Sequence, residues 1–343
     1  MQSFDLYLDS PSGDYDPQRL FELLEQHEHV HATPGDPSRF IYRNSETFVH
    51  FSVVVDLSLL GRAPVDEDEY DPYEDADERS VLPDEADFAV DEEDDEEAEG
   101  DAADETPAMP TVTVSIPLFR PRFFLSEAVS LLENLGGLDL TFSDPHEEDE
   151  NAPSTPNFER LTANYETLHS TVLPNIRDPE ALTRWTDEQA SQFVEYGKNR
   201  GAIASQLNDD SVEVPILQVA RSENGVRSLC VWRTNQSTVL PKCDLVLMQV
   251  AREKRGLLGR KTVYTDKVVS GSELWTTLSN DSEYREHPVP HLVHRPKDPP
   301  SQDLVVALSM LDSADGDSVK RTEFAGVIDF DIAPAAGEES SDD

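Results

Sequence analysis

Alternation between apolar and polar residues predicts that the first part of the chain forms half-buried β-strands. Along such a strand, successive side chains point to opposite faces of the sheet, so every second residue is apolar. The segments with strand character are 4–8, 39–43, 47–56, 111–116 and 138–142. Asn44-Ser45 is a tight joint between the second and third of these strands.

Two helices are predicted between these strands. Pro17 begins the first helix, with Asp16 as its N-cap. The second helix spans about 126–135 and ends before a pair of glycines. With residues 62–108 set aside, the order is strand, helix, two or three strands, strand, helix, strand. This order predicts an α+β sandwich of the ferredoxin-like kind over residues 1–143.

The second half of the chain, residues 157–332, changes from helical to strand periodicity and predicts a second α+β domain. Its predicted helices lie around 158–168, 186–207 and 272–278, with a capping pattern at Thr186-Asp187-Glu188-Gln189. Its predicted strands lie at 214–221, 226–234, 243–252, 261–269, 304–310 and 324–330. Turn residues separate the first four strands, which therefore predict an antiparallel meander.

Composition changes the picture at residues 62–108, which have almost no apolar periodicity. They hold 23 Asp and Glu against Arg62 and Arg79, and so contribute −21 of the net charge of −44. Such a segment cannot bury enough apolar surface to offset its ordering entropy, so we expect a disordered acidic insertion inside the first domain. By the same argument, 144–156 is an acidic linker and 333–343 a disordered acidic tail.

The acidic charge and the missing targeting signals bear on location and partners. The first ten residues have no signal-peptide pattern and no segment is apolar enough to span a bilayer, so we expect a cytoplasmic protein without a membrane partner. The charge argues against direct binding of nucleic acid by the whole protein. It reflects either adaptation to a saline habitat or an acidic arm that mimics nucleic acid and binds a basic partner.

The two cysteines, Cys230 and Cys243, cannot form a disulfide framework. They are expected on consecutive antiparallel strands, with Cys230 opposite about residue 247. In that register the thiols are offset and poorly placed to bond.

The segment His27-Glu28-His29-Val30-His31 matches the H-E-x-x-H pattern of zinc peptidases. On a helix this spacing puts His27 and His31 one turn apart as zinc ligands, with Glu28 as general base of a zinc-dependent hydrolase. Against this hypothesis, Thr33-Pro34-Gly35 stops a helix two residues later and no third ligand follows. The alternative is a helix that ends near Glu28 and a strand that opens at 29–31, which separates the two histidines.

Two further segments resemble ligand sites less closely. His287, His291 and His294 lie within eight residues, but the prolines between them predict a solvated loop rather than a metal site. The segment from Gly256 to Thr262 resembles a phosphate-binding loop, yet its glycine spacing differs and it joins two strands instead of opening a helix.

One predicted hairpin is basic although the chain is acidic. Between Ala251 and Lys267 the cations clearly outnumber Glu253 and Asp266. The hairpin is either a solvated tip or a docking surface, for an acidic partner or for the chain's own insertion. The candidate contact residues are Arg252, Lys254, Arg255, Leu257, Leu258, Arg260, Lys261 and Lys267.

No G-x-S-x-G, C-x-x-C or G-x-G-x-x-G motif occurs in the chain. The sequence therefore predicts a non-catalytic cytoplasmic interaction or regulatory protein with a protein partner and no cofactor. The zinc-dependent hydrolase and the nucleic-acid mimic are the alternatives from other functional classes.

Overall fold

A computed structural model describes residues 3–10, 16–57, 111–138, 140–145, 155–175, 182–222, 225–256, 259–297, 301–314 and 319–330. The predicted insertion at 62–108, the tail at 333–343 and most of the linker at 144–156 lie outside these ranges. The described part contains both helices and sheets, which confirms the α+β class. None of its helices combines the length and the apolar character needed to cross a bilayer.

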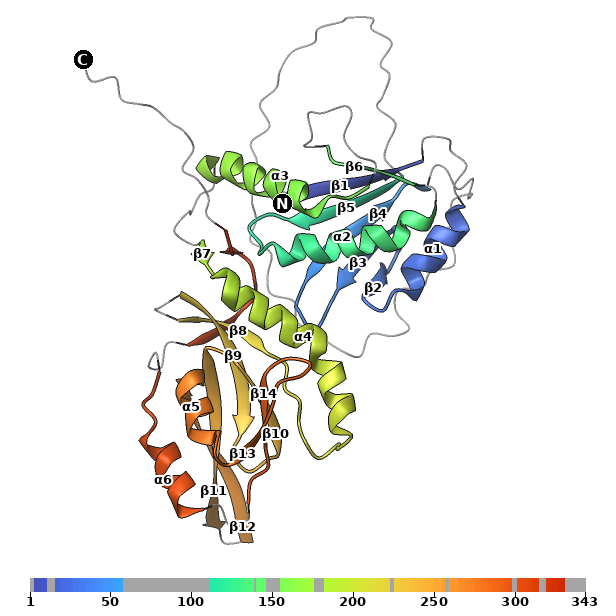
Figure 1. The fold of residues 1–343 in the computed structure, drawn as a ribbon. Helices are drawn as coiled ribbons and strands as arrows, with labels where there is room; N and C mark the ends of the chain where they lie inside the picture. Colours follow the sequence, from blue (N-terminus) through green and yellow to red (C-terminus); the bar gives the residue numbers. More distant parts are fainter. Residues whose placement is uncertain are drawn as a thin grey trace, which may run out of the picture.

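Six strands of the first part form an antiparallel sheet in the order β2-β3-β4-β5-β1-β6 (Figure 1). The strands are β1 (Ser3–Asp9), β2 (Val30–Thr33), β3 (Asp36–Arg43), β4 (His50–Val55), β5 (Val112–Pro117) and β6 (Thr141–Ser143). Two helices, α1 (Pro17–Gln26) and α2 (Phe123–Leu135), follow β1 and β5. This is the predicted order of elements. The ferredoxin-like assignment itself stays a prediction.

One face of this sheet carries the core, as the alternation predicts. Across β1, β5 and β4, Leu6 lies opposite Val114, which in turn lies opposite Val53, and all three side chains are buried. Helix α1 covers the same face, because Phe21 contacts Phe40, with ring centroids 5.6 Å apart. Figure 1 shows α1 and α2 across this face. Helices therefore cover this face of the sheet, and the loops that connect its strands are available to form binding sites.

Two longer helices connect the six-stranded sheet to the rest of the molecule. They are α3 (Phe158–Val172) and α4 (Asp187–Leu207). Thr186 caps α4 in the predicted capping box, since its side chain accepts from the Gln189 N–H and Gln189 reaches back to the Thr186 backbone. Asp16 caps α1 as predicted.

The second part contains a five-stranded sheet in the order β12-β11-β9-β8-β15. Its strands are β8 (Gln218–Ser222), β9 (Gly225–Arg233), β11 (Leu245–Gly256), β12 (Gly259–Ser270) and β15 (Lys320–Thr322). The predicted antiparallel meander is wrong at one connection, because β9 and β11 are parallel. The chain between them forms β10 (Thr238–Pro241), which belongs to another sheet. After this excursion the chain enters the five-stranded sheet again as β11, in the same direction as β9.

That other sheet has three strands in the order β10-β14-β13. Its remaining strands are β13 (Ser282–Arg285) and β14 (His291–His294). Helix α5 (Gly271–Leu278) confirms the predicted short helix, whereas the predicted strand at 304–310 is wrong and is helix α6 (Gln302–Met310). Ser301 caps α6 by accepting from the Leu304 N–H. An apolar run this short does not distinguish a strand from a helix.

One hydrophobic cluster extends through both parts. Phe324 lies near its centre, with ring centroids 5.2 Å from Phe123, 5.4 Å from Phe193 and 5.5 Å from Trp185. Nearby, β16 (Val327–Ile328) pairs in parallel with β7 (Thr183–Arg184). A segment late in the chain therefore completes the core between α2 and α4.

The cysteines are placed differently from the prediction. In the parallel register Cys230 lies opposite Val246, and Cys243 precedes β11. Both thiols are free, and that of Cys243 donates to the Leu245 carbonyl at 3.3 Å. The neighbouring Cys243 thiol, together with burial, raises the pKa of the Cys230 thiol. The predicted antiparallel register, with Cys230 opposite about residue 247, is therefore wrong, whereas both thiols are free and no disulfide joins them.

Candidate functional site

The helix required by the zinc hypothesis ends too early. Helix α1 stops at Gln26, His27 is its extended C-cap and β2 begins at Val30. The helical interpretation of the H-E-x-x-H pattern is therefore wrong, and the alternative of a helix followed by a strand is what the structure shows. The backbone is already extended at His27, and residues from Val30 on pair with β3, so the segment cannot continue the helix.

His27 and His31 lie on opposite faces of the six-stranded sheet. The His27 ring contacts Tyr42, with centroids 5.7 Å apart, and Tyr42 lies opposite the buried Val30. His31 is the next residue along β2, is exposed and lies opposite Ile41. Across the described residues, no group of three or more His, Cys, Asp or Glu is placed to hold a metal ion. Glu28, whose side chain is 82% exposed, contacts His29 Nε2 at 3.2 Å.

The second histidine group is structural rather than solvated. His291 and His294 lie on β14 and are 1% and 2% exposed. His294 shares a hydrogen bond of 3.0 Å with Ser282, and His291 one of 2.7 Å with the Val289 carbonyl. Burial lowers the pKa of both imidazoles, which are therefore neutral near pH 7. Only His287 is exposed, so the predicted solvated loop is wrong for the other two.

A buried carboxylate that sequence analysis missed lies beside His27. Glu127, on α2, is 4% exposed and accepts hydrogen bonds from Thr47 Oγ1 at 2.6 Å, Tyr42 OH at 2.9 Å and Asn44 Nδ2 at 3.2 Å. Burial, and then the charge of Glu127, raises the pKa of the Tyr42 phenol, which stays protonated and donates. Glu127 therefore anchors the loop after β3 to α2. The signal was a single charged residue in the apolar stretch 123–132.

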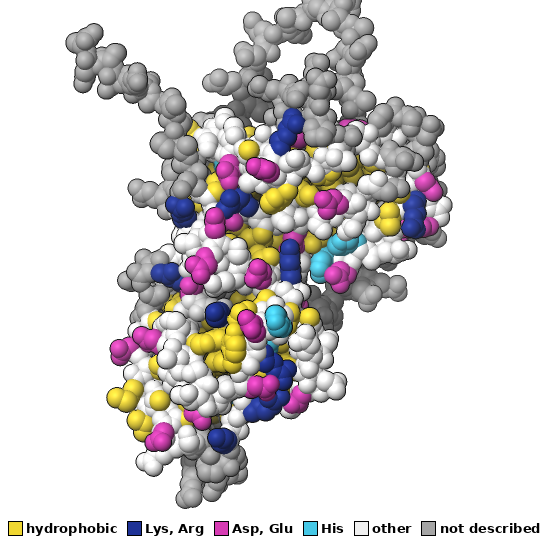
Figure 2. All heavy atoms as spheres, viewed as in Figure 1, with side chains coloured by type: hydrophobic (Ala, Val, Ile, Leu, Met, Phe, Trp, Pro, Cys, Tyr) yellow, Lys and Arg dark blue, Asp and Glu magenta, His cyan; other side chains and the backbone are white. Residues whose placement is uncertain are grey.

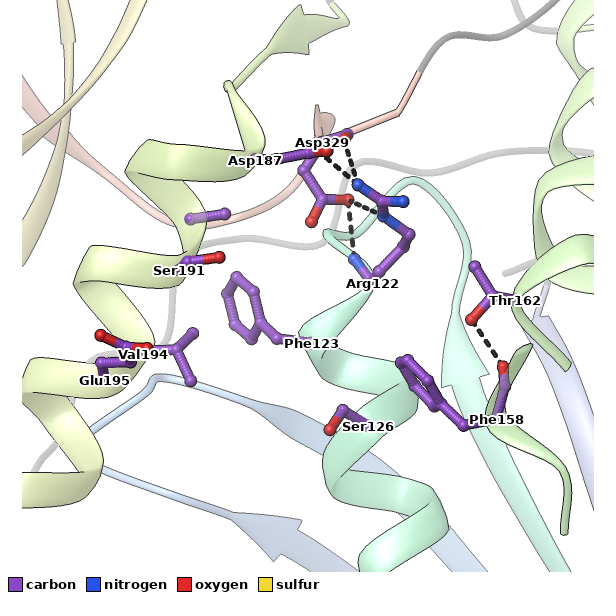
Figure 3. Close-up of a pocket in the computed structure, with 11 residues that line it drawn as sticks. Arg122, Phe123, Ser126, Phe158, Thr162, Asp187, Ser191, Val194, Glu195 and Asp329 are labelled. Atoms are coloured by element: carbon purple, nitrogen blue, oxygen red, sulfur yellow. Dashed lines mark hydrogen bonds and ion pairs between the residues drawn. The ribbon is translucent and has the colours of Figure 1, made fainter.

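A second cluster surrounds Arg122, at the end of a cavity of about 370 Å³ between α2, α3 and α4 (Figure 3). Arg122 contacts Glu166 at 3.5 Å, Asp329 at 3.4 Å and, more closely, Asp187. Burial alone would lower the pKa of Arg122, but these carboxylates raise it overall. We call Arg122, Glu166, Asp187 and Asp329 the Arg122 junction. It joins four segments of the chain, and its cation is fully engaged by the protein.

The predicted basic hairpin forms a two-stranded ribbon at the end of the five-stranded sheet. Strand β11 pairs with β12 from Leu245–Ser270 to Gly256–Gly259, whereas β9 pairs with β11 only as far as Gln249. From Gln249 to Gly256 is seven residues, or about 23 Å of strand. Figure 1 shows β11 and β12 running on past their neighbours. We call residues 250–256 and 259–265 the basic ribbon.

The register of the ribbon places cations directly opposite cations. Lys254 lies opposite Lys261, and Arg255 lies opposite Arg260, in two successive rungs. Arg252 lies opposite Val263. Like charges directly opposite each other destabilise a strand pair. The predicted tip residues Leu257 and Leu258 lie outside the described residues.

Lys267, the last predicted contact residue, is half-buried and contacts another segment of the fold. Its ammonium donates to the Leu311 carbonyl, just beyond α6, and so joins β12 to that helix. Beside this contact, α6 exposes Val305, Val306 and Met310, and Met310 is 76% exposed. An apolar helix face therefore lies next to the sheet from which the basic ribbon projects.

The face in Figure 2 shows acidic and basic side chains interspersed, with apolar side chains between them. Comparisons with protein-family models, with curated proteins and with solved structures gave no match. Functional inference therefore rests on the chemistry of these clusters.

Proposed function

We propose that the protein is a non-catalytic interaction protein of the cytoplasm that binds an acidic partner protein through its basic ribbon. The observation that carries this proposal is the register of the ribbon, in which cation faces cation at two rungs. Each such pair costs up to about 1 kcal/mol of folding free energy. An anionic partner offsets this repulsion. Binding therefore recovers free energy that the unbound, folded ribbon loses to the repulsion.

The length of the ribbon explains how this chain, which is strongly acidic overall, can bind an acidic partner. The net charge of −44 repels an acidic partner at long range. At physiological ionic strength, however, charges are screened over about 8 Å. The end of the ribbon lies about 23 Å beyond the last rung shared with β9, so its cations act largely independently of the body.

The neighbouring helix favours a protein over a nucleic acid as the partner. Val306 and Met310 lie one helical turn apart on α6 and are exposed, as is Tyr264 on β12. Exposed apolar side chains beside charged ones are typical of protein interfaces, whereas a phosphate backbone offers them no partner. The polyacidic segment 62–108, which lies outside the described residues, and the ferredoxin-like fold of residues 1–143 belong to this proposal as hypotheses.

The experiment compares two variants with the same net charge. The ribbon variant replaces Lys254, Arg255, Arg260 and Lys261 with Gln. The control variant replaces four cations elsewhere on the surface with Gln, at Arg19, Arg39, Lys297 and Lys320. Binding of a labelled peptide of alternating glutamate and leucine is measured by fluorescence anisotropy at 0.15 M salt.

We expect the ribbon variant to weaken peptide binding at least tenfold and the control variant less than twofold. Equal losses would show that only net charge matters and would reject the ribbon as the site. Tighter binding of a 20-base-pair DNA than of the peptide would replace the protein partner with nucleic acid. Ribbon-dependent self-association in sedimentation would instead identify a second copy of the chain as the partner.

A further inference from the structure

A groove of about 570 Å³ lies where the loop after β3 meets β8 and β15. Its walls come from three segments far apart in the chain, at 43–50, 216–219 and 321–324. This volume is in the range of small-molecule binding sites. The groove is remote in sequence from the basic ribbon and contains none of its residues, so its role goes beyond the proposed function.

Two arginines at the groove have no side-chain partner among the residues that the structure describes. Arg43 and Arg321 are exposed, and neither guanidinium makes an ion pair or a side-chain hydrogen bond within the described ranges. Acidic residues outnumber basic ones by 71 to 27 in this chain, so a shortage of carboxylates is not the reason. Glu323 is the one acidic residue among those that line the groove, which leaves a net charge of +1.

His50, which also lines the groove, adds no charge near pH 7. Burial, and then the nearby Arg120, lowers the pKa of its imidazole. Its ring packs against Phe124, with centroids 5.8 Å apart. The positive character of the groove therefore comes from Arg43 and Arg321 alone.

The apolar part of the groove is provided by Phe48 and Ile216, which are 41% and 36% exposed. Phe48 has a φ of +58°, in the left-handed region that an aromatic residue rarely adopts. Such a conformation costs about 1–3 kcal/mol and persists only where the surroundings impose it. The strain holds a large apolar side chain partly in solvent, which folding by itself does not favour.

Contacts from three directions impose this conformation on the loop. Asn44 Oδ1 accepts from the backbone N–H groups of Glu46 and Thr47, at 2.9 and 3.3 Å. Thr47 also donates to Glu127, and both nitrogens on one edge of the Arg200 guanidinium contact the Glu46 carboxylate. Opposite the loop lies Gly197, where a Cβ would come within 2.6 Å of the Glu46 carbonyl oxygen. The groove wall is thus preorganised.

One further polar atom points to a ligand with a hydrogen-bond donor. Gln218 Oε1 is buried and accepts no hydrogen bond from the described residues. An unsatisfied buried acceptor costs about 1–3 kcal/mol. A ligand N–H or O–H group in the groove would satisfy it.

We infer that this groove binds a small organic monocarboxylate with an aromatic or branched aliphatic body. Arg43 and Arg321 pair with the carboxylate, because guanidinium and carboxylate form strong charge-assisted hydrogen bonds. Phe48 and Ile216 contact the body, and Gln218 accepts from its donor group. The single negative charge of a monocarboxylate balances the net charge of +1 of the groove. A phosphate dianion carries two negative charges, and beside Glu323 one of them would lack a counter-charge.

The test uses indole-3-propionate as the probe and its neutral alcohol, indole-3-propanol, as the matched control ligand. The full chain carries ¹³C-labelled isoleucine methyl groups, so Ile216 reports on the groove. Ile41, which is 43% exposed on β3 and does not line the groove, reports on non-specific binding. Both ligands are titrated to 10 mM.

We expect saturable shifts at Ile216 but not at Ile41, with the acid bound at least tenfold more tightly than the alcohol. Replacing Arg43 and Arg321 with Gln should abolish this preference and leave binding of the alcohol within twofold. The control variant, Arg39→Gln with Lys320→Gln, should keep the preference. Equal affinity for acid and alcohol, or no saturable shift at Ile216, would overturn the inference.

A second variant separates binding from folding. Phe48→Gly removes the backbone strain, since glycine adopts a positive φ without cost, and it removes the apolar wall. We expect thermal stability to be unchanged or higher while affinity for indole-3-propionate falls at least fivefold. Unchanged affinity in this variant would contradict the assigned role of Phe48.

Discussion

At the Arg122 junction one guanidinium contacts three carboxylates, whereas in the basic ribbon cations face cations at two successive rungs. Both regions belong to a chain in which acidic residues are in large excess. Matched charges occur where segments of the chain must be joined, and unmatched charges occur on a projecting element. The difference suggests that the junction serves the fold and that the ribbon serves binding.

The strongest test of this comparison removes the cation of the junction. Arg122→Ala removes the guanidinium from Asp329, which is 5% exposed in the wild-type chain and keeps the hydrogen bond from the backbone N–H of residue 122. A buried charge without its counter-charge is strongly destabilising. We expect a loss of about 3 kcal/mol of unfolding free energy, measured by urea denaturation at pH 7.5.

Arg39→Ala is the matched control, because Arg39 makes only an exposed contact of 3.8 Å with Asp36. Its cost should stay below about 0.5 kcal/mol. Similar losses in the two variants would show that the junction has no special role in stability.

The next test concerns a buried imidazole on α3 that packs against Tyr165 and Phe330. Burial lowers the pKa of His169 to about 4, and its ring accepts from the Phe119 N–H at 2.7 Å. Because the folded-state pKa is below the unfolded value of about 6.5, the unfolded state binds more protons between these values. Stability contributed by the neutral ring is therefore complete above pH 6.5 and is lost as pH falls toward 4.

We expect the wild-type chain to lose about 2 kcal/mol from this group between pH 7.5 and pH 5, measured by urea denaturation at each pH. In His169→Gln that part of the pH dependence should disappear, although the other buried histidines still contribute. An identical slope in both proteins would show that His169 titrates normally in the folded state.

A smaller effect is expected at Glu127, a buried carboxylate that accepts hydrogen bonds from neutral side chains. In Glu127→Gln one carboxylate oxygen becomes an amide NH₂ that faces donors from Tyr42, Asn44 or Thr47. A lost buried hydrogen bond of this kind costs about 1–2 kcal/mol in urea denaturation. Glu133→Gln is the control on the same helix, because Glu133 is exposed. A cost as small as that of the control would show that the hydrogen bonds of Glu127 do not stabilise the fold.

The smallest effect should have the opposite sign and occurs in the ribbon. Lys254→Glu converts the Lys254–Lys261 rung into a pair of opposite charges. We expect a gain of about 0.2–1 kcal/mol if the ribbon unfolds with the rest of the sheet. The same substitution at Lys242, outside the ribbon, should change stability less. Destabilisation by Lys254→Glu would mean that the cations contribute to the fold.

The fold was predictable where local patterns determine it. Alternation in β1 and β5 and the capping residues Asp16 and Thr186 led to correct elements. The path of β10 was not predictable, because a strand carries no local signal for the sheet that it joins. Helix α6 was missed because an apolar run of five residues, Leu304 to Leu308, suits either structure, although Ser301 is a cap signal.

The candidate sites divide in the same way. The cations of the ribbon were visible as a local excess of charge, but their opposed register requires the pairing of β11 with β12. The groove brings together Arg43, Ile216 and Arg321, which no sequence pattern links. The zinc hypothesis failed because the two histidines share a face only on a helix, and α1 ends before them.

The position of Phe324 has a consequence for synthesis of the protein. This ring completes contacts with Phe193 and Trp185, yet it is made 131 residues after Phe193. At ordinary translation speeds, that interval lasts roughly 7–26 seconds. During this time the surfaces of α2 and α4 that receive Phe324 remain uncovered on the ribosome. Chaperone binding to the newly made chain should therefore decline once Phe324 has left the ribosome and packed between α2 and α4.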